Sequence, residues 1–333
     1  MKTAKHANLL VTSNPHIQDS ASTAKIMSLV IIALLPALIA SSVIFGFRAL
    51  MLAAVCVAAS IFFEWAYEKI MKKPSTVGDL SAVLTGLLIS MNVPVTLPYW
   101  IAIIGCFVAI VVVKQLFGGL GQNFANPAIT ARIVLFVSFA SDMTIWADPK
   151  QKVFSAADAV TSATPLGVMN EFGAEAAQSQ FDFDNMTMFL GNTGGSMGEV
   201  CAAALLIGGL FLIIMKVISP ATPIAFLGTM AVFSLLVGAD PIWQICAGGA
   251  MLGAFFMATD YATTPTTTLG KVIFGIGCGL ITMLIRFYGN YPEGVSFSIL
   301  LMNILTPHID SFCEKRLYGN PKKAAKAAEG GAK

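Results

Sequence analysis

The sequence predicts an all-α polytopic membrane protein, with about ten transmembrane helices in two inverted five-helix halves. Hydrophobic residues make up 56% of its 333 residues and charged residues only 11%, whereas soluble domains carry about 25% charged residues. The mean hydropathy is +0.77, and apolar runs recur along most of the chain. We therefore expect the lipid bilayer as a partner. The small net charge of +2 indicates no nucleic-acid partner.

The first membrane half is expected at residues 23–141, after a polar N-terminus at 1–22. That N-terminus lacks the layout of a cleaved signal peptide, so the first apolar run should stay in the protein. Glycines and prolines interrupt this half around 93–98 and 118–121. Broken helices at membrane depth occur inside a bundle or beside a cavity, so the breaks indicate a bound ligand or a transport path. The expected spans are 26–45, 49–70, 77–92, 99–115 and 127–141.

The second half is expected at 197–307, followed by a polar tail at 308–333. Because each half holds an odd number of spans, the halves must be inverted relative to each other. Similar Asn/Pro sequences at 123–127 and 290–294 open the fifth and tenth spans, which is what a duplication would leave, although two unrelated helix starts would look the same. The expected spans are 197–216, 222–238, 242–259, 270–287 and 293–307.

Lysine and arginine predict the orientation, because cytoplasmic loops carry an excess of both. With these spans, most basic residues fall at one end, which we assign to the cytoplasm together with both termini. Residues 142–196 then form an outer loop, which in a bacterial inner membrane faces the periplasm. Four residues lie against the rule, namely Arg48, Lys150, Lys152 and Arg286.

The outer loop holds the most distinctive stretch, a short polar strip that ends in a threonine and a proline. The ring of Pro165 biases Thr164 toward an extended backbone. The strip is thus a good substrate for an enzyme that modifies the threonine hydroxyl. No base lies beside Thr164, so we expect no catalytic residue here. In the alternative interpretation, Thr164 caps a helix that starts at Pro165. The strip comprises Asp158, Thr161, Ser162, Ala163 and Thr164.

Polar residues at the predicted cytoplasmic helix ends suggest a second site. Helix starts offer backbone N–H donors and hydroxyls, which suit an anion or a polar ring, although capping alone would also explain them. We expect a non-covalent ligand at Asn123, Asn126, Arg132, Asp260 and Thr264.

Acidic residues near the membrane indicate an ion pathway, because charges at membrane depth are costly and usually functional. Glu64 and Glu68 share one face of the second span, and Asp79 starts the third. Glu64 and Asp79 are the best candidates. Alternatively, each acid pairs with a nearby cation such as Lys69, Lys72 or Lys271. The scattered histidines and the cysteines without C-x-x-C spacing predict no metal site.

Several of these segments resemble one protein family over nearly the whole chain. The strip Asp158–Thr164 is similar to the acceptor site of flavin transferases, with Ser162 where many members have glycine. The segments 79–88, 123–128, 258–265 and 286–294 resemble the D subunits of Rnf electron-transport complexes. Those subunits are in turn similar to the B subunits of sodium-translocating NADH:quinone oxidoreductases.

The resemblance implies a subunit of a ferredoxin:NAD⁺ oxidoreductase complex that couples electron transfer to Na⁺ or H⁺ translocation. It implies FMN held as a phosphoester on Thr164 and a second, non-covalent flavin, riboflavin or FMN. The implied partners are the other Rnf subunits, including a second covalent flavoprotein, and a flavin transferase for maturation. A B-type quinone-reductase subunit, a solute transporter without redox chemistry and a passive membrane scaffold are the alternatives.

Overall fold

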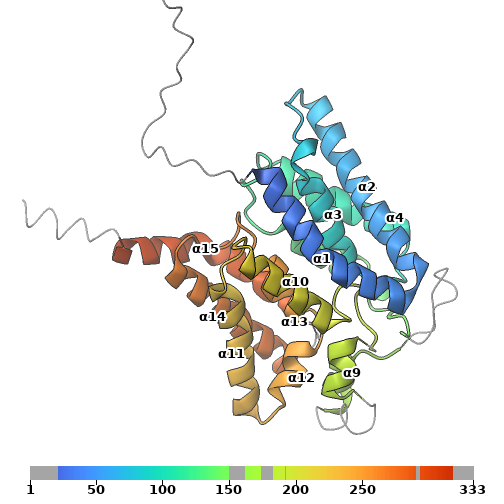
Figure 1. The fold of residues 1–333 in the computed structure, drawn as a ribbon, viewed down its shortest axis with the longest axis vertical. Coiled ribbons are helices and arrows are strands. Elements are labelled where there is room, and N and C mark those ends of the chain that lie inside the picture. Colours follow the sequence, from blue (N-terminus) through green and yellow to red (C-terminus); the bar gives the residue numbers. More distant parts are fainter. Residues whose placement is uncertain (1–21, 150–161, 174–182, 192, 290–292, 318–333) are drawn as a thin grey trace, which may run out of the picture.

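The computed structural model describes residues 22–149, 162–173, 183–191, 193–289 and 293–317, and its regular elements are helices (Figure 1). Four of them are long and apolar enough to cross a membrane. The expected all-α polytopic membrane fold is therefore confirmed. These four are α1 (Thr23–Phe45), α2 (Phe47–Ile70), α14 (Thr268–Tyr288) and α15 (Val295–Leu317), in which the apolar stretch is Val295–Cys313.

Shorter helices make up the rest of the bundle, and each expected span contains at least one helix. The inverted relation between the halves stays a prediction. The shorter elements are η1 (Val77–Asp79), α3 (Ser81–Met91), α4 (Tyr99–Phe107), its π-helical continuation η2 (Val108–Gln115), α5 (Pro127–Ser138), α6 (Ala140–Met143), α7 (Pro165–Phe172), α9 (Asn185–Leu190), α10 (Ala202–Ile214), α11 (Ala221–Val237), α12 (Pro241–Cys246), α13 (Ala250–Leu252) and the π-helix η4 (Gly253–Met257).

The first break in the helices follows α3, which is only about 16 Å long at 1.5 Å per residue. Residues 92–98 then run through the protein interior without forming a helix. Arg48, buried at the start of α2, hydrogen bonds their carbonyls: its Nε donates to Val95 O (2.7 Å) and its Nη2 to Thr96 O and Leu97 O (3.2 and 3.1 Å). Such a segment is tolerated because protein groups satisfy its carbonyls.

The second break divides the expected span 242–259 into α12, α13 and η4. Here Arg286 of α14 donates to Gln244 O (2.6 Å) and Ala247 O (2.8 Å). Arg48 and Arg286 are two of the four basic residues that run against the orientation rule. Both are buried, and both hydrogen bond a broken helix, so their positions follow from packing rather than from topology. Lys150 and Lys152 lie outside the described residues.

The two halves pack side by side, with α1 to α4 on one side of Figure 1 and α10 to α15 on the other. Helix α1 lies against α10, where Gly208 allows a close approach because a Cβ there would overlap the carbonyl oxygen of Ala33. Small residues at such crossings are typical of membrane helices.

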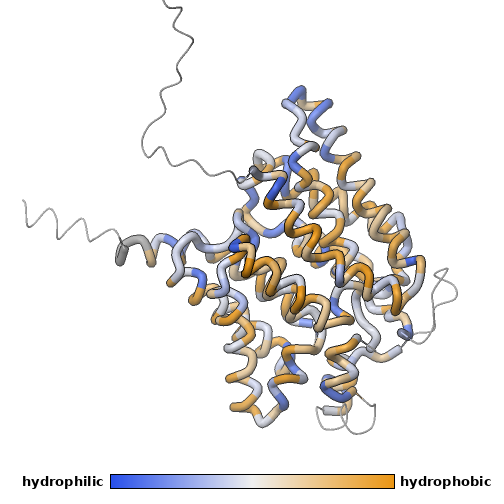
Figure 2. The backbone as a smooth tube through the Cα atoms, viewed as in Figure 1, coloured by the Kyte–Doolittle hydropathy of each residue, from blue (hydrophilic) through white to orange (hydrophobic). Residues whose placement is uncertain are grey.

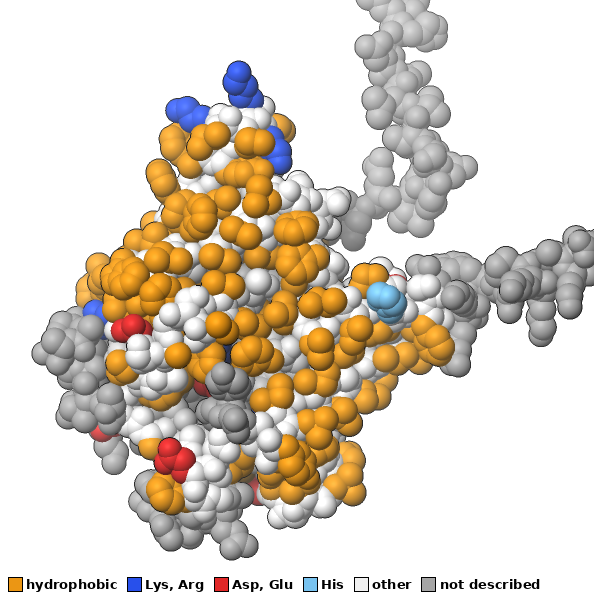
Figure 3. Space-filling model, turned by 180° about the vertical axis from the view of Figure 1, so that it is seen from behind, with side chains coloured by type: hydrophobic (Ala, Val, Ile, Leu, Met, Phe, Trp, Pro, Cys, Tyr) orange, Lys and Arg blue, Asp and Glu red, His pale blue; other side chains and the backbone are white. Residues whose placement is uncertain are grey.

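The outer surface of the bundle is apolar. Apolar residues run along the helices (Figure 2). In the rear view, apolar side chains cover the middle of the face, while Lys and Arg gather at one end (Figure 3). This distribution matches a bundle whose sides face lipid and whose ends face water.

Candidate functional site

Thr164 lies directly before α7 and caps it. Its backbone is extended (φ −84°, ψ 150°), as Pro165 predicts, and its Oγ1 accepts a hydrogen bond from Gly167 N at 3.1 Å. The capping interpretation of Thr164 is therefore confirmed. Its side chain is partly exposed, so the hydroxyl oxygen lies at the positive end of a helix and within reach of solvent.

The motif around Thr164 is held against the rest of the protein. Ser162 N donates to Trp146 O at 2.9 Å, and Ala163 is exposed. On α7, Leu166, Val168 and Met169 are buried. Asp158 and Thr161, also expected in the motif, lie outside the described residues.

Gly248 lies beneath α7 in the second break. Its φ is 57°, and a Cβ there would lie 2.7 Å from Leu166 Cδ1 and 3.5 Å from Arg286 Nη2. The broken helix of the second half, fixed by Arg286, is thus the platform on which the Thr164 helix rests.

A cleft opens at the opposite end of the bundle, between the start of α1, the start of α3, the end of η2 and the residues after η4. Three residues expected at a second site, Asn123, Asn126 and Asp260, line it together. The Oδ1 of Asn123 is buried without a hydrogen-bond partner among the described residues. Buried polar atoms are rarely left unpaired, so this oxygen indicates a ligand with a donor group.

Asp260 supplies an acid to the same cleft. Its Oδ2 accepts a hydrogen bond from Thr263 Oγ1 at 3.4 Å, and burial raises the pKa of its carboxyl. Apolar walls from Leu84, Leu88 and Phe255 complete the lining. An amide oxygen and a carboxyl at the edge of an apolar cleft suit a flat ligand with a polar rim and apolar faces.

The cleft is narrow, with a volume of about 80 Å³, whereas pockets for drug-sized ligands hold roughly 300–1,000 Å³. A tricyclic ring therefore requires the lining to move. Leu120 lies in the lining between Gly119 and Gly121, and the φ angles of these glycines are 102° and 84°. Glycines tolerate many backbone conformations, so this loop is the part of the lining that can change its conformation.

Two residues expected at the second site lie elsewhere. Thr264 Oγ1 donates to Ala258 O at 2.8 Å, and Thr264 lines a neighbouring cavity instead. Arg132 Nη1 donates to Glu199 Oε1 at 2.7 Å, and its Nη2 hydrogen bonds Glu293. Arg132 thus joins α5 of the first half to segments of the second, away from the cleft. Arg132 was expected at the same site because it is close to Asn126 along the chain. The first turns of α5 separate the two residues, and Arg132 lies toward the middle of the bundle.

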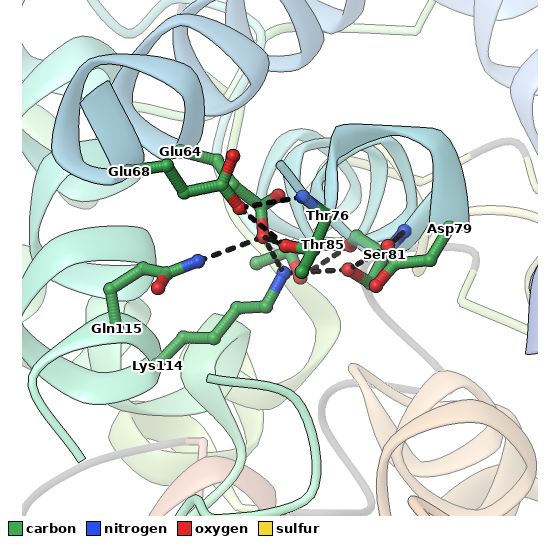
Figure 4. A network of polar contacts seen from close by, with 8 residues as sticks. All are labelled: Glu64, Glu68, Thr76, Asp79, Ser81, Thr85, Lys114 and Gln115. Carbon is green, nitrogen blue, oxygen red and sulfur yellow. Dashed lines mark hydrogen bonds and ion pairs between the residues drawn. The ribbon is translucent and has the colours of Figure 1, made fainter. Parts of the chain in front are cut away.

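The candidate ion residue Glu64 lies in a buried polar network (Figure 4). Lys114 of η2 reaches across to α2, with its Nζ 2.7 Å from Glu64 Oε1 and 2.6 Å from Ser81 Oγ. Gln115 Nε2 also donates to Glu64 Oε1, at 2.9 Å. Glu64 therefore has a cationic partner, as the alternative interpretation expected, but that partner is Lys114 and not one of the three lysines named for it.

The network holds more acid than base. Thr76 donates to Glu68 Oε1 from both its N and its Oγ1. The second carboxylate oxygens, Glu64 Oε2 and Glu68 Oε2, are buried with no hydrogen-bond partner among the described residues. With two buried carboxylates and one lysine, the network has one negative charge without a cationic partner among the described residues.

Asp79 has a local structural role at the edge of this network. Its Oδ1 accepts hydrogen bonds from Ser81 N at 2.9 Å and from Ser81 Oγ, at the start of α3. Ser81 in turn contacts Lys114, so Asp79 connects to Glu64 through two side chains. Sequence reasoning missed Lys114 because it appeared only as a basic residue after an apolar run. A lysine at the end of a span, with acids on a neighbouring span, is the signal that could have found it.

Comparisons with known proteins agree with the resemblance stated above. A family model described as "NQR2, RnfD, RnfE family" matches residues 10–319. The chain is 51% identical over 324 residues to the D subunit of the Na(+)-translocating ferredoxin:NAD(+) oxidoreductase complex of Acetobacterium woodii, covering 96% of this chain and 99% of that protein. It is 41% identical over 319 residues to the D subunit of the proton-translocating ferredoxin:NAD(+) oxidoreductase complex of Clostridium ljungdahlii, covering 93% and 96%. It is 37% identical over 346 residues to the D subunit of the ion-translocating oxidoreductase complex of Actinobacillus succinogenes, covering 93% and 97%.

Proposed function

The chain belongs to the NQR2, RnfD, RnfE family, and from this premise we propose that it is the D-type membrane subunit of an ion-translocating ferredoxin:NAD⁺ oxidoreductase complex. It lies in the bacterial inner membrane with both termini in the cytoplasm, and it carries FMN as a phosphoester on Thr164. Relatives that match over almost their whole length have this activity in their names, which favours it over the B-type subunit of a quinone reductase.

One observation carries the FMN proposal: the motif threonine is a partly exposed N-cap on a helix that is packed against the bundle. A phosphoester on Thr164 Oγ1 would lie at the N-terminus of α7, where the helix dipole favours negative charge. Gly167 N already points at this oxygen. A flavin supplies one-electron transfer once bound, and the buried face of α7 would hold it in one position.

The covalent attachment can be tested with a matched pair of N-cap variants. Thr164 and Thr267 cap α7 and α14 in the same way. In each, the threonine hydroxyl oxygen accepts a hydrogen bond from the backbone N–H of the glycine three residues further on, at 3.1 and 3.0 Å. Either Thr→Val change removes a cap and costs about 1 kcal/mol. In a host with a flavin transferase, Thr164→Val should abolish the flavin fluorescence of the denatured band, and Thr267→Val should keep it.

Mass spectrometry of the tryptic peptide that contains Thr164 should show the added mass of FMN. An unmodified wild-type peptide, or a fluorescent Thr164→Val band, would contradict the proposal. The first of these results would favour a solute transporter or a passive scaffold without a covalent flavin.

The second flavin, riboflavin or FMN, is proposed for the cleft of Asn123, Asn126 and Asp260. The unpaired Asn123 Oδ1 and the apolar walls support this assignment. The cleft and Thr164 lie at opposite ends of the bundle, so two flavins would mark the ends of an electron path across the membrane. Electrons would enter and leave through the other subunits, including a second covalent flavoprotein.

For the translocated cation, Na⁺ or H⁺, we propose a pathway past Glu64, with Asp79 at its edge. The unpaired Glu64 Oε2 and Glu68 Oε2 support it. In vesicles that contain the whole complex, Glu64→Gln and Asp79→Asn should slow ion transport while total flavin stays unchanged. The exposed residue Glu171 of α7 offers a control as Glu171→Gln. Equal loss of flavin and transport in the first two variants would indicate a folding defect and refute the pathway.

A further inference from the structure

A second cavity lies beside the cleft and has a volume of about 580 Å³. It opens between the end of α10, the start of α11, the residues after η4 and the start of α14. Its lining combines two lysines with several hydroxyl groups, and neither lysine belongs to the proposed redox or ion pathways. The polar lining residues are Lys216, Ser219, Thr222, Thr259, Tyr261, Thr264, Thr266 and Lys271.

Neither lysine of the cavity is held in an ion pair within the described ranges. Among the residues that the structure describes, neither Lys216 nor Lys271 forms an ion pair with a carboxylate. The carboxylate of Asp310 lies nearby and accepts a hydrogen bond from Thr266 N at 3.1 Å, but it forms no ion pair with either lysine. Two like charges that line one cavity repel each other, and an anion between them would remove that cost.

Lys271 lies where a positive charge is unfavourable, and Lys216 has a rare backbone conformation. Lys271 lies in the first turn of α14, which holds no acidic residue, so its positive charge faces the positive end of the helix dipole. Lys216 has a φ of 56°, which is rare for a residue other than glycine. An anion in the cavity would offset the first of these costs directly.

A threonine hydroxyl in the lining points to the same conclusion. Thr222 lines the cavity at the start of α11 and is only 1% exposed. It differs from Thr229 of the same helix, whose hydroxyl donates to the carbonyl four residues before it. The Thr222 hydroxyl has no such hydrogen bond within the described part of the chain, so it is an available donor for a ligand.

The surroundings of the cavity are those of a lipid site. Ile213 is part of the lining. Next to it, Ile214 at the end of α10 is 76% exposed, and Ile224 on α11 is 68% exposed. Aliphatic surface of this kind on a membrane helix faces acyl chains. Basic pockets between transmembrane helices on the cytoplasmic side bind anionic headgroups.

We propose that this cavity binds the phosphate headgroup of an anionic phospholipid, with Lys216 and Lys271 as its cationic partners and Thr222 as a hydroxyl donor. The acyl chains lie along the exposed faces of α10 and α11. Tyr261 lines both this cavity and the flavin cleft, and its hydroxyl donates to Val217 O. The lipid headgroup therefore packs against the wall of the cleft and stabilises it.

The chain offers matched controls for both lysines. Lys72, with a φ of 53°, has the same rare conformation as Lys216. Lys25 lies in the first turn of α1, as Lys271 does in α14. Neither control residue lines the cavity. The double variants Lys216→Gln/Lys271→Gln and Lys25→Gln/Lys72→Gln thus remove the same charge from similar backbone positions.

The experiment uses the whole complex, purified and stripped of lipid with detergent. Phosphatidylglycerol is titrated in, and native mass spectrometry counts the lipids that remain bound. The cavity variant should bind phosphatidylglycerol at least about tenfold more weakly than wild type, given two lysines near the headgroup. The control variant should bind like wild type, and phosphatidylcholine should not distinguish the three proteins.

Three results would overturn the proposal. Equal phosphatidylglycerol binding by both double variants would show that the cavity lysines hold no lipid. Binding of inorganic phosphate that displaces no lipid, and that the cavity variant loses, would assign the cavity to a free anion. Loss of extractable flavin with unchanged lipid would assign it to the phosphate of a flavin in the neighbouring cleft.

Discussion

Lys114 is a residue whose loss should strongly destabilise the first membrane half. Its Nζ lies 2.7 Å from Glu64 Oε1, and the two side chains are 2% and 0% exposed. At that distance the attraction is about 6 kcal/mol at an effective dielectric constant of about 20, and desolvation offsets a large part of it. Lys114→Met leaves Glu64 charged and buried, so we expect the free energy of unfolding to fall by about 3–5 kcal/mol.

Buried thiols provide the assay. Cys56, Cys106 and Cys278 are free and fully buried, so a dye that fluoresces on reaction with a thiol reports unfolding on heating. Lys114→Met should lower the unfolding midpoint strongly. The double variant Lys114→Met/Glu64→Gln should recover most of the loss, because its neutral glutamine can still hydrogen bond Thr76 and Gln115. The stability losses of Lys114→Met alone and Glu64→Gln alone are measured for comparison. If the loss in the double variant equals their sum, the ion pair does not stabilise the fold and the reasoning is wrong.

Three further changes test other parts of the structure. Arg48→Met leaves the carbonyls of the first break without their donor, so the same thiol assay should show a loss of at least about 3 kcal/mol, whereas Lys72→Met at an exposed site should show little. Gly248→Ala should lower the free energy of unfolding by about 1–2 kcal/mol because the φ of Gly248 is positive. It should also increase hydrogen exchange in α7, since the added Cβ would press on the buried face of that helix. Unchanged exchange in α7 would contradict the role of the broken helix as a platform. Asn123→Leu should lower the extractable flavin of the purified complex, but not its covalent flavin. It should not lower the stability of the flavin-free protein, because it removes an oxygen that is unpaired in the protein alone. Full retention of extractable flavin would exclude Asn123 from that site.

The arrangement also explains why the proposed electron path needs both halves of the chain. Thr164 rests on the broken helix of the second half, and the cleft is lined by both halves. Arg132 links them between these two places, through Glu199 and Glu293. A change at this link that separates the halves would disturb both proposed flavin positions together.

Local sequence patterns were enough to predict the helical membrane fold and the extended backbone at Thr164. Each depends on residues that are close along the chain: a run of apolar side chains for a membrane helix, or a proline ring beside the residue it restricts. The expected span 242–259 was wrong as a single helix. Its glycines were visible in the sequence, but the arginine that satisfies the break comes from a helix about 40 residues further on.

The sequence alone determined that this is a helical membrane protein and which threonine carries the motif, because hydropathy and short motifs are properties of neighbouring residues. Only the tertiary structure decided that Lys114 pairs with Glu64, that Arg132 leaves the cleft while Asn123 and Asp260 share it, and that two arginines support broken helices. Each of these contacts joins residues far apart in the chain. Their partners are chosen by the need to satisfy buried charges and carbonyls inside the bundle, a condition that arises only when the helices have packed.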